Sequence, residues 1–518
     1  MAARVSIRVD ASARMGTGHL KRCLALADAL EAAGAEVGLV VRAIDPVAAQ
    51  LLARTAWAVK WLSTPAGQAA SWPSSAEDPP HAYWAQVPWQ QDAIETIKAL
   101  RAQPPDWLVL DHYAFDARWH QAVTHALGVR LLVIDDTADR SLAADALLDH
   151  NWHANHRAKY AGRLLKLPRW LCGPRFALLS SAYRDARRYQ PQADVRSIGI
   201  FMGGTDPGGI SMRVLAACRD AGFTGEIEIA TTSANPKLAD LRAACAASPP
   251  AHLTIDLPDL ASFFARHDLQ IGAGGGATWE RCCIGAPTIA LALTNNQTAV
   301  VPALAQLGAV RAASLPGSAM SDDPPLTTVL VDLLDDAPAR ARLAKRAGAL
   351  VDGRGAQRVA LHLLAATLQV RPAIHNDAEQ LLQWRNNSKV RAMSIQGDEI
   401  ALSDHLDWLS RALTSPDRWL MVGHLGEYPV GSVRFDRMAN DQQKVSLYLD
   451  PDLLGLGLGP HLLLAGEQAL AKRLGRHFTV RATVLPGNTA SQRLFETCGY
   501  HGGPLQYAKS VEPSHEDS

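Results

Sequence analysis

The sequence predicts an α/β protein made of two doubly wound halves and a smaller third domain. Its 518 residues exceed the roughly 250–300 that a single hydrophobic core supports, so several domains are expected. Short β-rich runs alternate with Ala- and Leu-rich helical stretches up to about residue 310, a pattern typical of parallel sheets covered by helices. Two glycine-rich turns, near residues 16 and 203, each follow a strand and open a helix, which favours two similar halves.

The individual elements follow from the spacing of apolar residues. Short apolar runs predict strands over Arg4–Asp10, Trp107–Asp111, Arg130–Asp135, Arg196–Met202, Asp268–Gly272 and Thr288–Leu293. Helical spacing predicts helices over Leu20–Ala33, Ile210–Ala221 and Asn296–Leu307. The Pro-, Ser- and Trp-rich stretch Ser63–Pro88 is expected to be a long surface excursion.

A change of pattern near Val370 marks the third domain. A strand passes into an amphipathic helix there, and antiparallel-looking strands follow over Trp419–Leu425, Val430–Asp436 and Lys444–Leu449. We therefore expect Rossmann-like halves over residues 1–190 and 191–368, and an α+β domain with a mixed sheet over residues 369–510. The polar residues 511–518 are expected to be a disordered tail.

The composition excludes several classes of protein. Lysine plus arginine (51) balances aspartate plus glutamate (51), so the chain lacks the positive charge that nucleic acids and anionic membranes attract. The seven cysteines are scattered and never spaced C-x-x-C, which is typical of a reducing cytosol. No signal-peptide pattern or membrane-spanning stretch is found. We expect a cytoplasmic protein without metal, nucleic acid or membrane partners, and the oligomeric state stays open.

The first glycine turn carries a candidate catalytic histidine. Gly16 and Gly18 let the chain turn sharply after the first strand, and His19 then begins a helix. The positive end of the helix dipole favours the neutral imidazole, which can act as a base. Ligands bind at this edge of an α/β sheet, where Asp111 and Tyr113 are also predicted to lie. The alternative is that His19 only packs at the turn.

The second half has turn residues suited to ligand binding at three successive strand ends. The glycines Gly203–Gly204, which are followed by Thr205, and again Gly274–Gly276, are predicted to let a diphosphate approach the backbone closely. Glu280 is placed to accept hydrogen bonds from ribose hydroxyls, and Asn296 and Gln297 follow the next strand. The alternative for each glycine run is a simple tight turn. No G-x-x-x-x-G-K-[ST] motif occurs, which disfavours ATP-type phosphoryl transfer.

The ordered motifs of residues 4–350 resemble a known family. They are R-V-D-A-S, G-T-G-H, D-H-Y, G-G-T-D-P, G-A-G-G-G-A-T-W-E-R and N-N-Q. Together they look like the UDP-sugar hydrolases of pseudaminic acid synthesis, which have a GT-B-like fold and release UDP by attack of water. The resemblance implies that His19 is the catalytic residue. It also implies that the UDP-sugar site is lined by Gly204, Thr205, Gly274, Gly275, Glu280, Asn296 and Gln297.

The third domain resembles the GNAT acetyltransferases. A glycine loop between a strand and a helix is followed by the pattern N-x-x-S-x-x-L-F-E-x-x-G-Y. The resemblance implies that this loop binds the pyrophosphate of the co-substrate acetyl-CoA, through Leu454, Gly455, Gly457, Gly459 and Asn488. Two residues depart from the family pattern. Leu454 stands where Arg or Gln is usual, and Phe495 replaces the Tyr that often protonates the leaving thiolate.

The acceptor side of the third domain is less determined by its sequence. Tyr448 and Tyr507 are alternative groups for protonating the thiol, and His405 and Glu399 are weak candidates for the general base. An acceptor pocket formed by Trp384, Arg385 and Trp408 is the remaining hypothesis. Tryptophans at helical spacing are, however, more often part of a core.

Three functions fit these patterns. The first is a bifunctional enzyme that acetylates a UDP-4-amino-4,6-dideoxy-AltNAc and hydrolyses UDP-2,4-diacetamido-2,4,6-trideoxy-L-altropyranose to UDP and free sugar. The second is a GT-B glycosyltransferase joined to a GNAT domain. The third is a non-catalytic nucleotide-sugar-binding scaffold, for which Leu454 and Phe495 are the best support.

Overall fold

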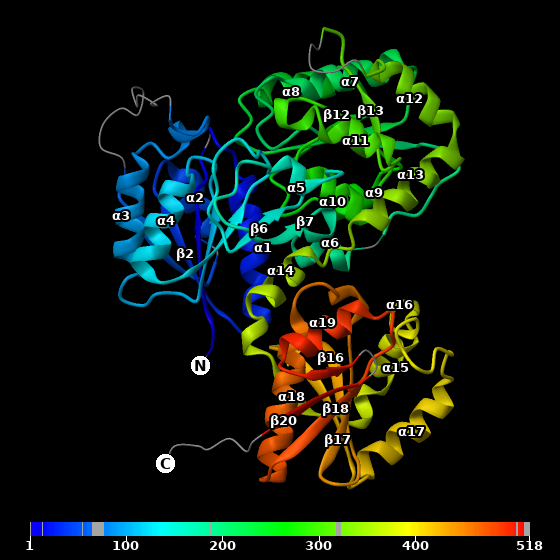
Figure 1. The fold of residues 1–518 in the computed structure, drawn as a ribbon. Coiled ribbons are helices and arrows are strands. Elements are labelled where there is room, and N and C mark those ends of the chain that lie inside the picture. The colour runs from blue at the N-terminus through cyan, green and yellow to red at the C-terminus, as the bar shows by residue number, and fades with distance from the viewer. Residues whose placement is uncertain are drawn as a thin grey trace. The chain divides into compact units, whose positions relative to one another are not determined.

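The computed structural model describes residues 2–12, 14–53, 55–64, 77–186, 188–317, 323–503 and 506–511. The chain divides into two compact units, which are followed by colour in Figure 1. The N-terminal unit contains Arg4–Ala29 and Val37–Val359. The C-terminal unit contains Ala360–Ser518 together with the short segments Met1–Ala3 and Leu30–Glu36. The boundaries predicted at residues 190 and 368 remain predictions.

The first half of the N-terminal unit is built on a sheet in the order β3-β2-β1-β4-β5-β6-β7. The pairs β1–β4, β2–β3, β4–β5, β5–β6 and β6–β7 are parallel. The strands are β1 (Arg4–Val9), β2 (Glu36–Arg42), β3 (Ala58–Leu62), β4 (Trp107–Asp111), β5 (Arg130–Ile134), β6 (Ala146–Asp149) and β7 (Arg169–Cys172). The strand order reverses between β1 and β4, so their carboxyl ends flank the usual ligand crevice.

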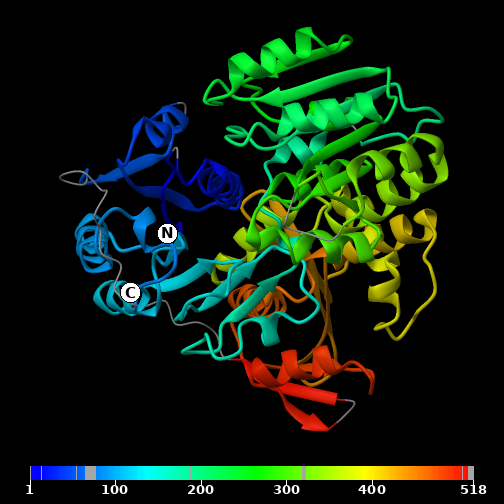
Figure 2. The ribbon, with the colours of Figure 1, turned by 90° about the horizontal axis from the view of Figure 1, so that it is seen from above.

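The second half has its own parallel sheet, in the order β10-β9-β8-β11-β12-β13. The strands are β8 (Ser197–Phe201), β9 (Glu226–Thr231), β10 (Ala251–Ile255), β11 (Leu269–Ala273), β12 (Thr288–Leu291) and β13 (Arg311–Ala313). The reversal falls between β8 and β11, the strands that precede the two predicted glycine turns. Figure 2 shows this sheet in green, with the first sheet running from blue to cyan.

Helices cover both parallel sheets and bury their apolar stripes against them. Helices α3 and α4 lie side by side in the first half (Figure 1). The first half and its connections contain α1 (Gly18–Ala32), α2 (Pro46–Leu52), α3 (Trp89–Leu100), α4 (Ala117–Leu127), α5 (His156–Lys159) and α6 (Ser181–Asp185). The second half contains α7 (Ile210–Asp220), α8 (Leu238–Ala246), α9 (Ala261–Arg266), α10 (Ala277–Ile284), α11 (Val300–Gln306), α12 (Leu326–Asp335), α13 (Ala337–Leu350) and α14 (Gly355–Leu363).

The C-terminal unit has a mixed sheet in the order β14-β15-β16-β17-β18-β20-β19, in which only the pair β17–β18 is parallel. Its strands are β14 (Gln369–Pro372), β15 (Arg418–Leu425), β16 (Tyr428–Arg437), β17 (Gln442–Leu449), β18 (Phe478–Thr483), β19 (His501–Gly503) and β20 (Gln506–Val511). Its helices are α15 (Ala378–Asn386), α16 (Ser388–Arg391), α17 (Leu402–Thr414), α18 (Leu458–Leu474) and α19 (Thr489–Thr497).

The predicted fold class is confirmed, with two parallel sheets of Rossmann type followed by a mixed α+β domain. The predicted helix Asn296–Leu307 is wrong at its start, because a 3₁₀ turn over Asn295–Gln297 precedes α11. The surface excursion is wrong at its end, since Ala85 and Val87 are buried in the core of the first half. Its residues 65–76 lie outside the described residues, as does the predicted tail apart from Val511, which ends β20.

Two negative findings concern only the described parts of the chain. No helix there combines the length and the apolar character needed to cross a bilayer. No cluster of three or more His, Cys, Asp or Glu side chains in those residues is placed to hold a metal ion.

Candidate functional site

His19 and Asp111 form a hydrogen-bonded pair where β1 and β4 end. The Nδ1 atom of His19, in the first turn of α1, lies 2.7 Å from Oδ1 of Asp111, the last residue of β4. A carboxylate accepts the proton of Nδ1–H, so the lone pair of Nε2 remains available to take a proton. The structure therefore brings together two predicted site residues in the arrangement of a general base and its orienting acid.

Arg22 holds Asp111 in its charged form. Its Nε and Nη2 atoms donate to the two carboxylate oxygens of Asp111 at 2.5 and 2.6 Å. Burial by itself would raise the pKa of Asp111, but the charge of Arg22 and the hydrogen bonds from Arg22 and His19 outweigh burial and hold that pKa well below its usual range. Arg22 was not predicted, although its place one helical turn after His19 follows from the sequence.

Aromatic rings surround the His19 imidazole. Tyr113 and Trp84 contact it edge-on, with ring centroids 4.8 and 5.7 Å away, and these two rings stack on each other at 5.7 Å. Trp84 lies in a 3₁₀ turn, Ala82–Trp84, at the end of the predicted excursion. Sequence reasoning missed Trp84, because a tryptophan in a Pro-rich stretch gives no signal of the strand end it will contact.

A polar network continues from Tyr113 into the second half of the unit. The Tyr113 hydroxyl donates to Asp136, which also accepts from Asn151 Nδ2 at 2.9 Å. The other end of the Asn151 amide accepts from Trp279 Nε1 at 3.1 Å. Trp279 belongs to α10, the helix that follows the Gly274–Gly276 turn. The network thus connects the His19 site to the helix that carries Glu280.

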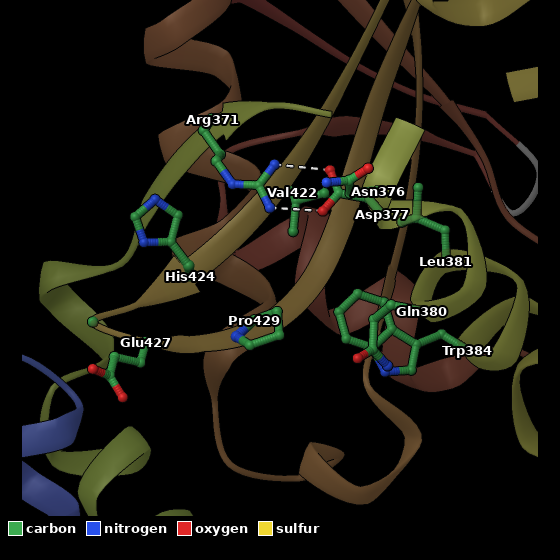
Figure 3. Close-up of a pocket in the computed structure, with 11 residues that line it drawn as sticks. Arg371, Asn376, Asp377, Gln380, Leu381, Trp384, Val422, His424, Glu427 and Pro429 are labelled. Carbon is green, nitrogen blue, oxygen red and sulfur yellow. Dashed lines mark hydrogen bonds and ion pairs between the residues drawn. The ribbon is translucent and has the colours of Figure 1, made fainter. Parts of the chain in front are cut away.

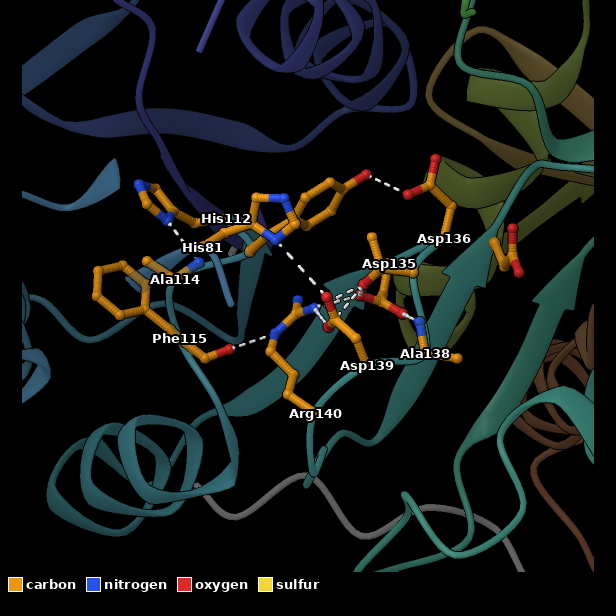
Figure 4. A network of polar contacts seen from close by, with 12 residues as sticks. His81, His112, Ala114, Phe115, Asp135, Asp136, Ala138, Asp139 and Arg140 are labelled. Atoms are coloured by element: carbon orange, nitrogen blue, oxygen red, sulfur yellow. Dashed lines mark hydrogen bonds and ion pairs between the residues drawn. The ribbon is translucent and has the colours of Figure 1, made fainter. Parts of the chain in front are cut away.

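The two neighbouring aspartates at the end of β5 have different surroundings (Figure 4). Asp135 accepts from Arg140 Nη1 at 2.6 Å and from the Ala138 N–H at 2.9 Å, so it caps its own loop. Asp136 instead faces Tyr113 in the site. Of the Asp-Asp pair in the sequence, only the second residue takes part in the candidate site.

The glycines of the second half serve different needs. A Cβ on Gly204 would lie 3.0 Å from Thr232, and the Gly204 carbonyl accepts from the Thr232 N–H at 3.0 Å. A Cβ on Gly274 would lie 2.3 Å from Val301, and its N–H already donates to the Leu291 carbonyl at 2.9 Å. Gly274 is therefore a packing residue, and the N–H groups of Gly275 and Gly276 are the ones without a partner in the described chain. Thr205 lies in the loop directly after Gly204 and before α7.

Glu280 and Gln297 lie around the same turn. Glu280 is in the first turn of α10, and burial raises the pKa of its carboxyl group. Its buried Oε2 atom has no partner among the described residues. Gln297 accepts from the Leu293 N–H at 2.9 Å, which holds the loop after β12. The backbone of Asn296 lies in the 3₁₀ turn beside it.

In the C-terminal unit, β17 and β18 part before β17 ends. They pair from Gln442 to Val445, whereas β17 continues to Leu449 along β16 only. The glycine loop follows, with Gly455 and Gly457 at φ +83°, a left-handed conformation that favours glycine. Gly457 directly precedes α18, which has no side-chain cap. Phosphate groups commonly bind at helix starts of this kind.

The other predicted acetyl-CoA residues have structural contacts. A Cβ on Gly459 would lie 2.5 Å from Leu494, so glycine lets α18 pack closely on α19. Asn488 accepts from the Ser491 N–H at 3.0 Å and caps α19. The side chain of Leu454 is 38% exposed at the position where the family has Arg or Gln. These residues surround the loop, and their contact with a ligand stays a prediction.

Phe495 is surrounded by two tyrosines. Its ring lies 4.9 Å from that of Tyr500 and stacks on Tyr507 at 6.1 Å. The Tyr500 hydroxyl donates to the buried Glu467 at 2.6 Å. Burial raises the pKa of Tyr500. Tyr448 lies elsewhere, on the sheet face that also carries Arg434, and burial raises its pKa to about 12.

The three predicted acceptor residues have different surroundings, although Trp384 and Trp408 pack in the same hydrophobic cluster. Trp384 is buried and lines a cavity of about 460 Å³, together with the ion pair of Arg371 and Asp377 (Figure 3). Arg385 and Trp408 do not line that cavity. Trp408 is stacked between His405 at 5.6 Å and the Arg434 guanidinium at 5.7 Å. Glu399, the other weak base candidate, pairs with Arg391 at 3.3 Å and is 74% exposed.

Comparisons with known proteins match both units. Residues 367–501 match the acetyltransferase (GNAT) domain family. The chain is 24% identical over 306 residues to the UDP-2,4-diacetamido-2,4,6-trideoxy-beta-L-altropyranose hydrolase of Campylobacter jejuni, which covers 59% of this chain and 97% of that protein. It is 30% identical over 190 residues to the spore coat polysaccharide biosynthesis protein SpsG of Bacillus subtilis, covering 36% of this chain and 56% of that protein.

Among solved structures, MurG of Acinetobacter baumannii aligns with 69% of this chain and 98% of its own, at 15% identity and a TM-score of 0.49. The chain spans only about half the length of SpsG, as its 56% coverage shows. The predicted organisation is confirmed: the chain joins a homologue of a UDP-sugar hydrolase to a C-terminal GNAT acetyltransferase domain.

Proposed function

We propose that the chain is a bifunctional nucleotide-sugar enzyme. Its C-terminal unit transfers the acetyl group of acetyl-CoA to the 4-amino group of a UDP-4-amino-4,6-dideoxy-AltNAc. Its N-terminal unit hydrolyses UDP-2,4-diacetamido-2,4,6-trideoxy-L-altropyranose to free sugar and UDP. The observation that carries the hydrolase part is the His19–Asp111 pair where β1 and β4 end. The hydrolase activity for which the Campylobacter relative is named and the match to the GNAT family support the same two reactions.

Hydrolysis needs a base close to the anomeric carbon. Asp111 fixes the Nδ1–H of His19, so Nε2 accepts a proton from water as the water oxygen bonds to that carbon. The bond from the anomeric carbon to the phosphate oxygen breaks, and its electron pair leaves with UDP. In this proposal the N–H groups of Gly275 and Gly276, which have no partner in the described residues, stabilise the phosphate charge. The Glu280 carboxylate, whose Oε2 is unpaired in the same residues, accepts from the ribose hydroxyls.

Acetyl transfer would take place where β17 leaves β18. The amine nitrogen bonds to the thioester carbonyl carbon and gives up a proton to solvent, the C–S bond breaks, and the leaving thiolate takes up a proton. Gly455 and Gly457 shape the loop for the pyrophosphate of the co-substrate. Phe495 has no hydroxyl, so Tyr448 and Tyr507 are the proposed proton donors.

Both reactions are tested by supplying acetyl-CoA and the UDP-4-amino sugar and following free thiol and UDP. His19→Ala should leave thiol release intact and reduce the rate of UDP release by roughly 10²–10⁴-fold, which is the usual contribution of a general base to the rate. Gly457→Trp should block thiol release but not the hydrolysis of substrate that is already acetylated. A wild-type protein that releases UDP only when a sugar acceptor is added would favour the glycosyltransferase alternative. A protein that binds UDP and releases neither product would favour the scaffold.

A further inference from the structure

Arg281 is a buried cation directly behind the Gly274–Gly276 turn. It is in α10, next to Glu280, and its side chain is among the largest that are fully buried, at 1% exposure. No ion pair joins it to an acid in the described part of the chain, and its guanidinium lies over the ring of Phe264 at 5.8 Å. Burial of a cation without a paired carboxylate is costly, so such a residue needs an explanation.

The hydrogen bonds of Arg281 all go to the end of β11 and the start of α10. Its Nη2 atom donates to the Ala273 carbonyl at 2.8 Å and to Thr278 Oγ1 at 3.1 Å. Nε and Nη1 have no acceptor in the residues that the structure describes. A Cβ on Gly272 would lie 2.1 Å from Nη1, so the glycine makes room for the guanidinium under the turn.

Arg340 in the same half shows what a purely structural buried arginine does. It is also 1% exposed and forms no ion pair with an acid in the described residues. Its Nη1 donates to the carbonyls of Leu333 and Leu334, and its Nη2 to those of Gln192 and Ala193. Four carbonyl oxygens thus surround the Arg340 charge, whereas a single carbonyl and a hydroxyl face that of Arg281.

Burial lowers the pKa of Arg281 to about 10, which leaves the guanidinium charged at neutral pH. The nearest acid in sequence is Glu280, and burial raises the pKa of its carboxyl group. The guanidinium is bound to the Ala273 carbonyl, directly before the turn whose Gly275 and Gly276 N–H groups have no partner in the described residues, so a ligand at that turn would lie in its field. A positive charge in a low-dielectric setting acts over several ångströms without direct contact.

We infer that Arg281 is the counter-charge for the diphosphate of the bound nucleotide, which it attracts through the glycine turn without touching it. This inference rests on the proposed function, in which the N-terminal unit binds a UDP-sugar. It makes Arg281 a positioning and charge-compensating residue, distinct from the donors that contact the phosphates. The affinity gained through Arg281 should therefore grow with the charge of the ligand.

Calorimetric titration of the full-length protein with uridine, UMP and UDP tests the inference without any turnover. Arg281→Gln removes the charge but keeps an amide that can donate to the Ala273 carbonyl. We expect this change to weaken the affinity for UDP by roughly tenfold, the affinity for UMP by less, and the affinity for uridine hardly at all. The matched control Arg340→Gln should weaken the affinities for the three ligands by one common factor.

An equal loss for all three ligands in Arg281→Gln, or no loss for any, would overturn the inference while leaving the proposed UDP site standing. If Arg281→Gln no longer binds uridine, the charge-conserving Arg281→Lys decides. A ratio of UDP affinity to uridine affinity near that of the wild type supports the inference. Equal affinities for the two ligands overturn it. A wild-type protein that binds none of the three compounds contradicts the proposed function itself.

Discussion

At the scale of single residues, the chemistry of the candidate site depends on how His19 is held. The Nδ1 atom faces Asp111 at 2.7 Å, and Arg22 keeps that carboxylate charged by two short hydrogen bonds. A histidine at a helix start can be predicted from the G-T-G-H motif. The arginine that fixes its partner cannot, because the contact joins residues 89 positions apart.

Replacing Asp111 by Asn should therefore damage catalysis more than binding. The amide cannot hold Nδ1–H in the same way, so the wrong imidazole tautomer becomes populated and kcat should fall by roughly 10²–10⁴-fold. KM for the UDP-sugar should change by only about threefold, because ribose and phosphate contacts remain. Steady-state assays of UDP release measure both constants. Asp116→Asn, at the start of α4 where Asn also caps a helix, is the matched control and should behave like wild type.

A second residue-scale prediction concerns acid stability. Burial lowers the pKa of His120 to about 3, against about 6.5 in an unfolded chain. Below about pH 6.5 the unfolded chain binds a proton that folded His120 does not, so the stability of the fold decreases as pH falls. His120→Asn should therefore lose less stability on acidification than wild type, by about 1.4 kcal/mol per pH unit between pH 6 and 4.5. Thermal unfolding at several pH values measures this, and equal losses in both proteins would contradict it.

At the scale of elements, a buried charge cluster joins helix α3 to the first strands. Asp92 accepts from Arg8 Nη2 at 2.6 Å, from Arg42 Nη2 at 2.7 Å and from Trp119 Nε1 at 3.1 Å, and all four residues are buried. Asp92→Ala would leave two guanidinium groups without their shared acid. We expect a loss of about 3–5 kcal/mol in the free energy of unfolding, measured as a lower melting temperature. Asp185→Ala, which breaks an exposed ion pair with Arg184, should change it little.

The packing of α18 on α19 gives a prediction with a built-in rescue. Gly459→Ala would place a Cβ 2.5 Å from Leu494 and push the two helices apart. Because the glycine loop precedes α18, KM for acetyl-CoA should rise by several-fold, roughly what a contact of about 1 kcal/mol contributes. Adding Leu494→Ala should restore it, as thiol-release assays would show. A defect that persists in the double variant would mean that Gly459 is needed by the ligand and not by the packing.

The elements also show where sequence reasoning stops. Strands such as β4 and β8 were predicted within a residue or two, because buried parallel strands are short, apolar and bounded by turn residues. The helix expected over Asn296–Leu307 fails at its start, since the Gln297 side chain bonds the Leu293 N–H and favours a 3₁₀ turn. Trp84 was placed at the surface, because only tertiary contacts bring it against His19. Local patterns predict elements, whereas contacts between distant segments decide the site.

At the scale of the whole molecule, the N-terminal unit carries one continuous network across its two halves. It runs from Tyr113 through Asp136 and Asn151 to Trp279 on the helix that bears Glu280. No spacing in the sequence indicates this connection. The C-terminal unit has its own glycine loop and its own parted strands, so each unit holds the parts of one proposed reaction.

Asn151→Leu tests whether this network sets the distance between base and nucleotide. Losing both amide bonds should free α10 from the His19 side, and kcat for UDP release should fall by roughly 10–100-fold, as expected for a displacement of about 1 Å. Calorimetric affinity for UDP should stay within about threefold of wild type, because the glycine turn is untouched. Trp279→Phe removes one of the same bonds, and combining both changes should cost no more than Asn151→Leu alone. Fully additive losses would show that the two residues act separately.

The glycine run at residues 274–276 has a consequence for tolerance to substitution. A methyl group at Gly274 would collide with Val301, whereas at Gly276 it would meet nothing within 4 Å, and at Gly275 only the end of the Gln297 side chain at 3.5 Å. None of the three has the left-handed backbone that demands glycine. Alanine at position 276 should therefore leave the folding of the protein unchanged. A need for glycine at this position would then come from a ligand that approaches the turn from outside, and not from packing within the protein.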